Sequence, residues 1–134
     1  MKGRALADGV ADGRALVLHE PLSLWGGVDP ATGLIIDARH PQRGESVSGR
    51  VVVMPAARGS SSSSSVLAEA VRVGTAPAAI VLGEPDLILA VGAAVGEELY
   101  HRRVPIVQLA PADLAAIPDG AVVMISEGGE VTLG

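Results

Sequence analysis

Residues 51–65 read VVVMPAARGSSSSSS, and they join two different sequence patterns. The first four residues are apolar and mostly β-branched, which predicts a buried strand. After the serines, apolar residues recur at helical spacing from Val66 to Val73, and Gly74 stands where a helix commonly ends. A buried strand is therefore expected to pass, through a glycine and a run of hydroxyl side chains, directly into a helix.

Serine runs are common in flexible linkers. This run is short and lies between two apolar segments, so we interpret its first serines as a tight loop and its last ones as the first helical turn. Ser64 or Ser65 is the expected N-cap of that helix. A helix N-terminus offers free backbone N–H groups and a positive dipole end. The junction is thus expected to attract carboxylates and phosphates and to favour an ionised hydroxyl.

Short apolar runs alternate with polar turns along the rest of the chain. Strands are predicted over residues 14–18, 34–37, 49–54, 78–82, 104–109, 122–125 and 131–133, the last two forming a hairpin across Gly128-Gly129. Residues 5–6 are expected to pair with the first strand across an Asp12-Gly13 turn. Helical patterns cover 66–73 and 95–102, a helical turn is expected over 113–117, and residues 87–94 fit either a strand or a helix. Strand, helix and strand over 49–82 predict a parallel βαβ crossover.

Composition limits the class of protein. The chain has 134 residues, which predicts one domain spanning 1–134, and 49% of them are hydrophobic although there is one Trp, one Tyr and no Phe. Cysteine is absent, so neither a disulfide nor a thiolate metal site can come from this chain. The net charge of −5 favours neither nucleic acid nor an anionic membrane as a partner. Without a secretory signal or a spanning segment, the expected compartment is the cytoplasm.

Two further loops contain candidate site residues. Residues 25–30 include paired glycines, Gly26-Gly27, followed by Asp29 before a proline. This stretch fits either a surface turn whose Trp25 covers the core or a loop that approaches a ligand closely. The polar loop over 38–44 contains His40, which taken alone is more often a surface or packing histidine than a catalytic one.

Motif spacing supports no complete catalytic or metal centre. The three histidines share no ligand spacing, and a triad of Ser60, His40 and Asp29 or Asp37 has no support from spacing. Part of a larger active site fits the residues better than a free-standing enzyme. The alternative from another class is a non-catalytic anion-binding module, in which Gly59 to Ser63 hold a phosphate or carboxylate.

Four segments together resemble the small, swivel-domain subunit of the aconitase X family: residues 26–33, 37–41, 44–50 and the stretch from Met54-Pro55 to Ser62. The resemblance covers nearly the whole chain. It implies an α/β fold of the swivelling β/β/α type, like the fourth domain of aconitase. A mixed, partly barrel-like sheet flanked by helices is expected.

The same resemblance implies a hydro-lyase in which Ser60 is the catalytic base. It also implies a large partner subunit that carries an iron–sulfur cluster on its own cysteines, while this chain binds no cofactor or metal and is inactive alone. Substrate contacts are expected from Arg58, Gly59, Ser61 and Ser62, and from the loop residues Gly27, Asp29 and His40.

Two substrates are known for the family. The plain serines of this loop resemble the bacterial members, which dehydrate cis-3-hydroxy-L-proline; the alternative is the archaeal substrate, mevalonate 5-phosphate. The chain departs from aconitase because no arginine directly follows the first two serines. Arg58, the hydroxyls or the partner chain would then have to bind the substrate carboxylate.

Overall fold

The apolar runs form the central strands of one sheet in the computed structural model, which describes residues 1–134. β2 (Ala11–Val17), β3 (Val51–Met54), β4 (Ala79–Leu82) and β5 (Ile106–Gln108) lie side by side and parallel. Antiparallel strands flank them, so that the order is β1-β5-β4-β3-β2-β6-β7. The sheet is therefore mixed, as predicted.

Both faces of the central sheet are covered, which explains why its strands read as continuous apolar runs. Side chains alternate along β3, so Val52 and Met54 join one core cluster while Val51 and Val53 join the other. The first cluster lies under the helices α2 (Ser63–Val73) and α3 (Leu87–Tyr100). The second lies between the sheet, the short helix α4 (Pro111–Ala115) and the C-terminal strands.

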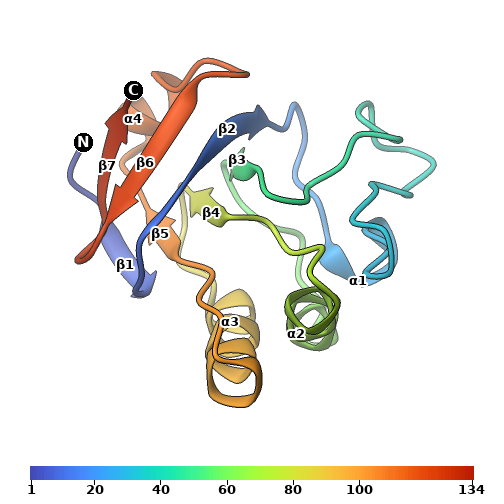
Figure 1. Cartoon of the computed structure of the whole chain (residues 1–134). Helices are drawn as coiled ribbons and strands as arrows, with labels where there is room; N and C mark the ends of the chain where they lie inside the picture. The colour runs from blue at the N-terminus through green and yellow to red at the C-terminus, as the bar shows by residue number, and fades with distance from the viewer.

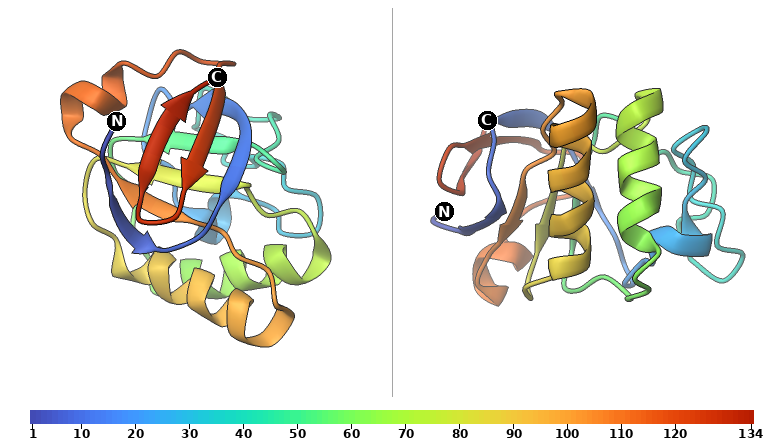
Figure 2. Two further views of the ribbon diagram at one scale, coloured as in Figure 1. Left: turned by 60° about the vertical axis from the view of Figure 1, so that its left-hand side comes forward. Right: turned by 90° about the horizontal axis from the view of Figure 1, so that it is seen from below.

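Helices α2 and α3 run next to each other on one face of the sheet (Figures 1 and 2). Two glycines of α3 permit close packing. A Cβ atom on Gly92 would lie 2.8 Å from the backbone oxygen of Ser64, and one on Gly96 would lie 3.1 Å from the side chain of Val71. The N-termini of both helices lie at the edge where the parallel strands end (Figure 2).

The two edges of the sheet meet through the N-terminal residues. β1 (Arg4–Ala7) pairs with β5 at one edge, and β6 (Val122–Ser126) and β7 (Glu130–Leu133) form a hairpin at the other. The backbones of Lys2 and Glu130 form an isolated antiparallel β-bridge, and the Gly3 N–H donates to the Gly129 carbonyl at 3.0 Å. These contacts close the sheet in part, which confirms the barrel-like architecture.

Several local predictions are confirmed and others are wrong. The strand–helix junction, the ending of α2 at Gly74 and the hairpin across Gly128-Gly129 are as expected, and residues 87–100 are one helix. However, Asp12 and Gly13 lie inside β2, and β1 pairs with β5 instead of β2. Residues 34–37 form only isolated bridges, to Val28 and Ser46, because that segment lies outside the sheet. None of the helices has the length and apolar character needed to cross a bilayer.

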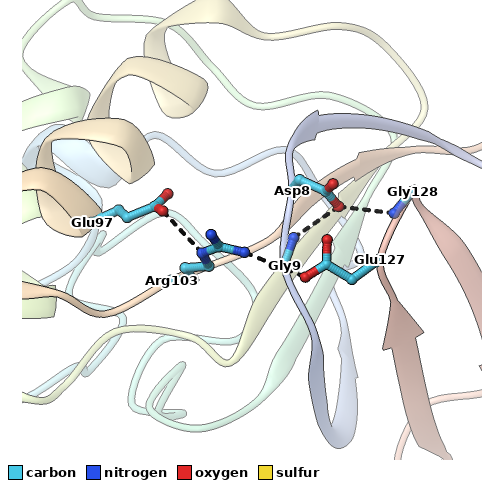
Figure 3. A network of polar contacts seen from close by, with 6 residues as sticks. All are labelled: Asp8, Gly9, Glu97, Arg103, Glu127 and Gly128. Carbon is cyan, nitrogen blue, oxygen red and sulfur yellow. Dashed lines mark hydrogen bonds and ion pairs between the residues drawn. The ribbon is translucent and has the colours of Figure 1, made fainter.

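A polar network holds the turn after β1 against its neighbours (Figure 3). Asp8 accepts the N–H groups of Gly9 and Gly128, each at 2.9 Å. Beside it, Arg103 pairs with Glu97 of α3 at 2.9 Å and with Glu127 at 3.3 Å. These contacts fasten the hairpin turn between β6 and β7 to β1 and α3, where the two sheet edges meet.

The Asp8 contacts predict a pH-dependent stability. The N–H groups of Gly128 and Gly9 favour the carboxylate and hold the pKa of Asp8 below its ordinary value. Because the folded pKa is depressed, this stabilisation is present above about pH 4 and is lost as the pH falls through the folded value. Thermal melts should show wild type more stable than Asp8→Asn at pH 7, with the gap closing in acid. The matched control is Asp12→Asn, since Asp12 is exposed and accepts no side-chain hydrogen bond; a gap at Asp8 that stays constant with pH would contradict the prediction.

Candidate active site

The serine loop, residues 55–62, connects the end of β3 to the start of α2. At its centre, the Oγ of Ser60 accepts the backbone N–H of Ser62 at 3.3 Å, and the Ser60 carbonyl accepts the Ser63 N–H at 2.9 Å. Ser60 is half-buried, between exposed Gly59 and exposed Ser61. An N–H that already points at the hydroxyl oxygen would stabilise negative charge on it.

Unpaired backbone donors surround Ser60. The N–H groups of Gly59, Ser60 and Ser61 donate no hydrogen bond within the chain. Three successive free donors at the start of an eleven-residue helix are suited to an anionic group. The side chain of Arg58 is exposed and enters none of the chain's ion pairs, so it too is available to an anion.

The later serines have structural contacts. Ser63 is 2% exposed, and its Oγ accepts the Trp25 N–H at 3.2 Å. Ser64 donates to the Ser61 carbonyl at 2.8 Å, and Ser65 is exposed. The expectation that Ser64 or Ser65 is the N-cap is therefore wrong. The helix begins at Ser63, ahead of the apolar pattern, and the Ser60 hydroxyl accepts the N–H of the capping residue, Ser62.

Gly27 and Asp29 were expected to contact a substrate, and in the structure both stabilise their own loop. Gly27 is buried, and a Cβ atom there would lie 2.9 Å from the Leu22 side chain. The Asp29 carboxylate accepts the Ala31 N–H at 2.9 Å, while its carbonyl accepts the Gly33 N–H at 2.7 Å. Both residues thus shape the turn between α1 (Leu24–Gly27) and the following segment.

His40 has no free ring nitrogen to offer a substrate. It is 6% exposed, its Nδ1 accepts the Gln42 N–H at 3.1 Å, and its Nε2 lies 3.0 Å from the Glu20 carbonyl, to which it donates. Gln42, which sequence reasoning missed, is also buried and bonds the backbone of Val17 and His19. The pair anchors the polar loop to the end of β2, so we leave His40 out of the proposed site.

Trp25 lies beside the serine loop and does not cover the core. Its side chain is 59% exposed, whereas its backbone is tied to Ser63. A second contact joins the same two segments, since the Arg58 N–H donates to the Leu22 carbonyl at 3.3 Å. The surface-turn interpretation of residues 25–30 is therefore right about the turn at Asp29 and wrong about Trp25, which does not cover the core.

Neither a metal centre nor an enclosed polar pocket surrounds Ser60. The chain has no group of three or more His, Cys, Asp or Glu side chains that could hold a metal. A cavity of about 360 Å³ opens at the ends of β2 and β3, but its lining is mainly apolar and its single charged residue is Glu84. That lining does not suit an anionic substrate. The serine loop therefore offers a hydroxyl and free backbone donors on an open surface.

Comparison with known proteins gives the family context. The sequence model of a family described as the aconitase X swivel domain matches residues 1–133. A cis-3-hydroxy-L-proline dehydratase of Pseudomonas aeruginosa is 49% identical over 117 residues, which are 86% of this chain and 20% of that protein. A phosphomevalonate dehydratase small subunit of Methanosarcina acetivorans is 37% identical over 96% of this chain and 87% of its own length.

The solved structures agree with this context. The crystal structure of aconitase X from Thermococcus kodakaraensis in its holo form matches with a TM-score of 0.88 at 35% identity, covering 99% of this chain and 96% of the matched chain. This likeness confirms the expected swivel fold. The chain spans only about a fifth of the hydroxyproline dehydratases that it matches, in P. aeruginosa and in Hypocrea jecorina.

Replacing the buried, hydrogen-bonded Ser63 should destabilise the fold more than replacing the exposed Ser65. Ser63→Ala removes the acceptor of the partly buried Trp25 N–H, and we expect a loss of about 0.5–1.5 kcal/mol in the free energy of unfolding. Ser65→Ala is the matched control on the exposed side of the same helical turn and should be neutral or slightly stabilising, because alanine favours helix. Denaturant unfolding of both variants measures the difference. A Ser65→Ala loss equal to that of Ser63→Ala would contradict the assignment.

Proposed function

This chain belongs to the aconitase X swivel-domain family, and from that membership we propose that it is the small subunit of a dehydratase, with residues 1–134 as one swivel domain. The observation that carries the proposal is the hydroxyl of Ser60. It lies against the Ser62 N–H, among three free backbone donors, on a surface that a partner can cover. Ser60 acts as the base in a site shared with a large subunit.

Elimination of water from a hydroxy acid needs two events. A proton leaves the carbon next to the carboxylate, and a hydroxyl leaves the neighbouring carbon, so that a double bond forms between them. In the ionised form, Ser60 takes the proton. The Ser62 N–H and the positive end of α2 stabilise its negative charge before the transfer. A closed site with little water makes these interactions stronger.

Departure of the hydroxyl is assisted by a Lewis acid, for which this chain has no metal-binding cluster. There is no cysteine and no cluster of metal-binding side chains, so the residues present do not fit an iron–sulfur cluster. Lewis-acid assistance to the leaving hydroxyl is the chemistry that a cluster held by the large subunit would supply. This chain's part is to orient the substrate and remove the proton.

Five groups of the serine loop are proposed to bind the substrate. The free N–H groups of Gly59 and Ser61 and the guanidinium of Arg58 face an anionic group, and the hydroxyls of Ser61 and Ser62 add hydrogen bonds. In aconitase, an arginine directly after the two serines contacts the substrate carboxylate. This chain lacks that arginine, and Arg58 makes the carboxylate contact instead.

Cis-3-hydroxy-L-proline is the proposed substrate. Support comes from the higher identity to the P. aeruginosa hydroxyproline dehydratase, 49% against 37% for the M. acetivorans small subunit. Mevalonate 5-phosphate is the second candidate, because this chain matches almost the full length of separate phosphomevalonate dehydratase small subunits.

The test is an assay of the complex, reconstituted with the aconitase X large subunit of the same genome, on both compounds. We expect turnover of the hydroxyproline; turnover of the phosphate ester alone would reverse the assignment, and tight binding of small anions without a large subunit would favour a non-catalytic module.

Ser60→Ala should remove activity without removing the fold. A general base contributes about 10²–10⁴-fold to the rate, and we expect kcat to fall by at least that range. Loss of the acceptor for the Ser62 N–H should cost about 0.5–2 kcal/mol of stability, which leaves the isolated chain folded.

The matched variants are Ser61→Ala and Ser65→Ala, assayed in the same complex over a range of substrate concentrations, so that kcat and KM are both measured. Ser61→Ala should mainly raise KM, because its expected role is a hydrogen bond to substrate, and Ser65→Ala should behave as wild type. Full activity of Ser60→Ala would place the base on the partner subunit.

A further inference from the structure

Two large apolar side chains that adjoin the serine loop are mostly exposed. Trp25 is 59% exposed and Leu87 is 77% exposed, the highest value among the large apolar residues. We infer that Trp25 and Leu87 form an apolar rim, on which the large subunit closes over Ser60. The inference rests on the proposed function and adds the surface through which the shared site is sealed.

Trp25 is held at its position by the backbone. Its N–H donates to the buried Ser63 hydroxyl at 3.2 Å, and the Ser23 hydroxyl donates to its carbonyl at 3.1 Å. The following residue, Gly26, has a φ of +76°, which turns the chain sharply and keeps α1 irregular. The only tryptophan of the chain is thus fixed at the base of α2 with its ring outside the core. Exposed tryptophan fixed in this way is typical of a contact surface.

Leu87 is fixed by the start of α3. The Asp86 carboxylate caps that helix by accepting the Leu89 N–H at 2.9 Å. The next side chain, Ile88, comes within 3.8 Å of the position that a Cβ atom on Gly59 would occupy. The first turn of α3 therefore adjoins the glycine that precedes Ser60, and Leu87 extends from this turn into solvent.

The two side chains come from opposite sides of the serine loop. Helix α2 lies between α1 and α3 in every view in which all three are seen (Figures 1 and 2). The backbone of Trp25 in α1 is hydrogen-bonded to the start of α2, and the Ile88 side chain of α3 lies near Gly59, in the loop that leads into α2. A surface that spans α1, the serine loop and the first turn of α3 would therefore contact both Trp25 and Leu87.

The reaction itself requires such a seal. The ionised Ser60 is useful as a base only where water is excluded, and apolar contacts around a polar centre exclude water effectively. The loop between the two side chains contains the polar donors, so the arrangement is a polar centre with an apolar border.

The large subunit is the occupant that fits this surface. In the hydroxyproline dehydratases, the matched region is about a fifth of one polypeptide, so the remaining four fifths belong to the same enzyme. A second copy of this chain fits poorly, because it would place two helix N-termini, both positive, face to face and would add no acid for the leaving hydroxyl.

The test compares two leucines of one helix. Leu87→Ser and Trp25→Ala should each weaken binding of the large subunit by about tenfold or more, measured by calorimetry. Leu99→Ser is the matched control, because Leu99 is also exposed, at 59%, but lies about 18 Å further along α3. It should bind as wild type, and all three isolated chains should keep their melting temperature within a few degrees.

A second measurement does not depend on any variant. Trp25 is the only tryptophan of the chain, so 5-fluorotryptophan gives a single ¹⁹F signal. Its H₂O-to-D₂O isotope shift should decrease when the unlabelled large subunit is added. An unchanged shift, wild-type binding by Leu87→Ser and Trp25→Ala, or equal losses at Leu87 and Leu99 would each overturn the rim. Failure of the wild-type chain to bind the large subunit would instead overturn the proposed function.

Discussion

Parallel pairing of β3, β4 and β5 is the constraint on which the rest of the structure depends. A strand can reach a parallel neighbour only by a crossover, and crossovers of one hand return on the same face of the sheet. Helices α2 and α3 therefore lie together on one face, with their N-termini at the edge where the strands end. The serine loop begins the first crossover, so its position at this edge follows from the pairing. The small residues Gly92 and Gly96 let α3 approach closely enough to complete the layer.

The parts of the fold that could be predicted are those with a local cause. The apolar run before Pro55 predicts a buried strand, and the spacing from Val66 to Val73 predicts the helix and its end, although the helix begins three residues earlier, at Ser63. The turn at Asp12-Gly13 was wrong because a turn-forming dipeptide can also lie inside a strand, where pairing with β6 overrides its preference. The pairing of β1 with β5 joins residues about a hundred positions apart, and no local pattern encodes that contact.

In the candidate site, too, the features with a local cause could be predicted from the sequence and those that depend on distant residues could not. Glycine and serine between a strand and a helix predict the anion-binding loop, and the structure adds the hydrogen bond from the Ser62 N–H to Ser60. The functions of His40 and Ser63 depend on distant partners, Glu20 and Trp25, so their residue types could not separate a ligand contact from a structural one. A buried polar side chain needs its hydrogen bonds satisfied, and the chain leaves no buried side-chain polar atom without a partner. Gln42 follows from the same rule, although nothing in its sequence context indicates it.

Partial closure of the sheet has a mechanical consequence. Residues 1–3 connect the β1 edge to the β7 edge, and the Asp8 and Arg103 contacts fasten the same junction. Strands in such a sheet cannot slide past one another without breaking several hydrogen bonds at once. The domain is therefore stiff against internal shear, and the serine loop, held between β3 and α2, keeps its place relative to the sheet.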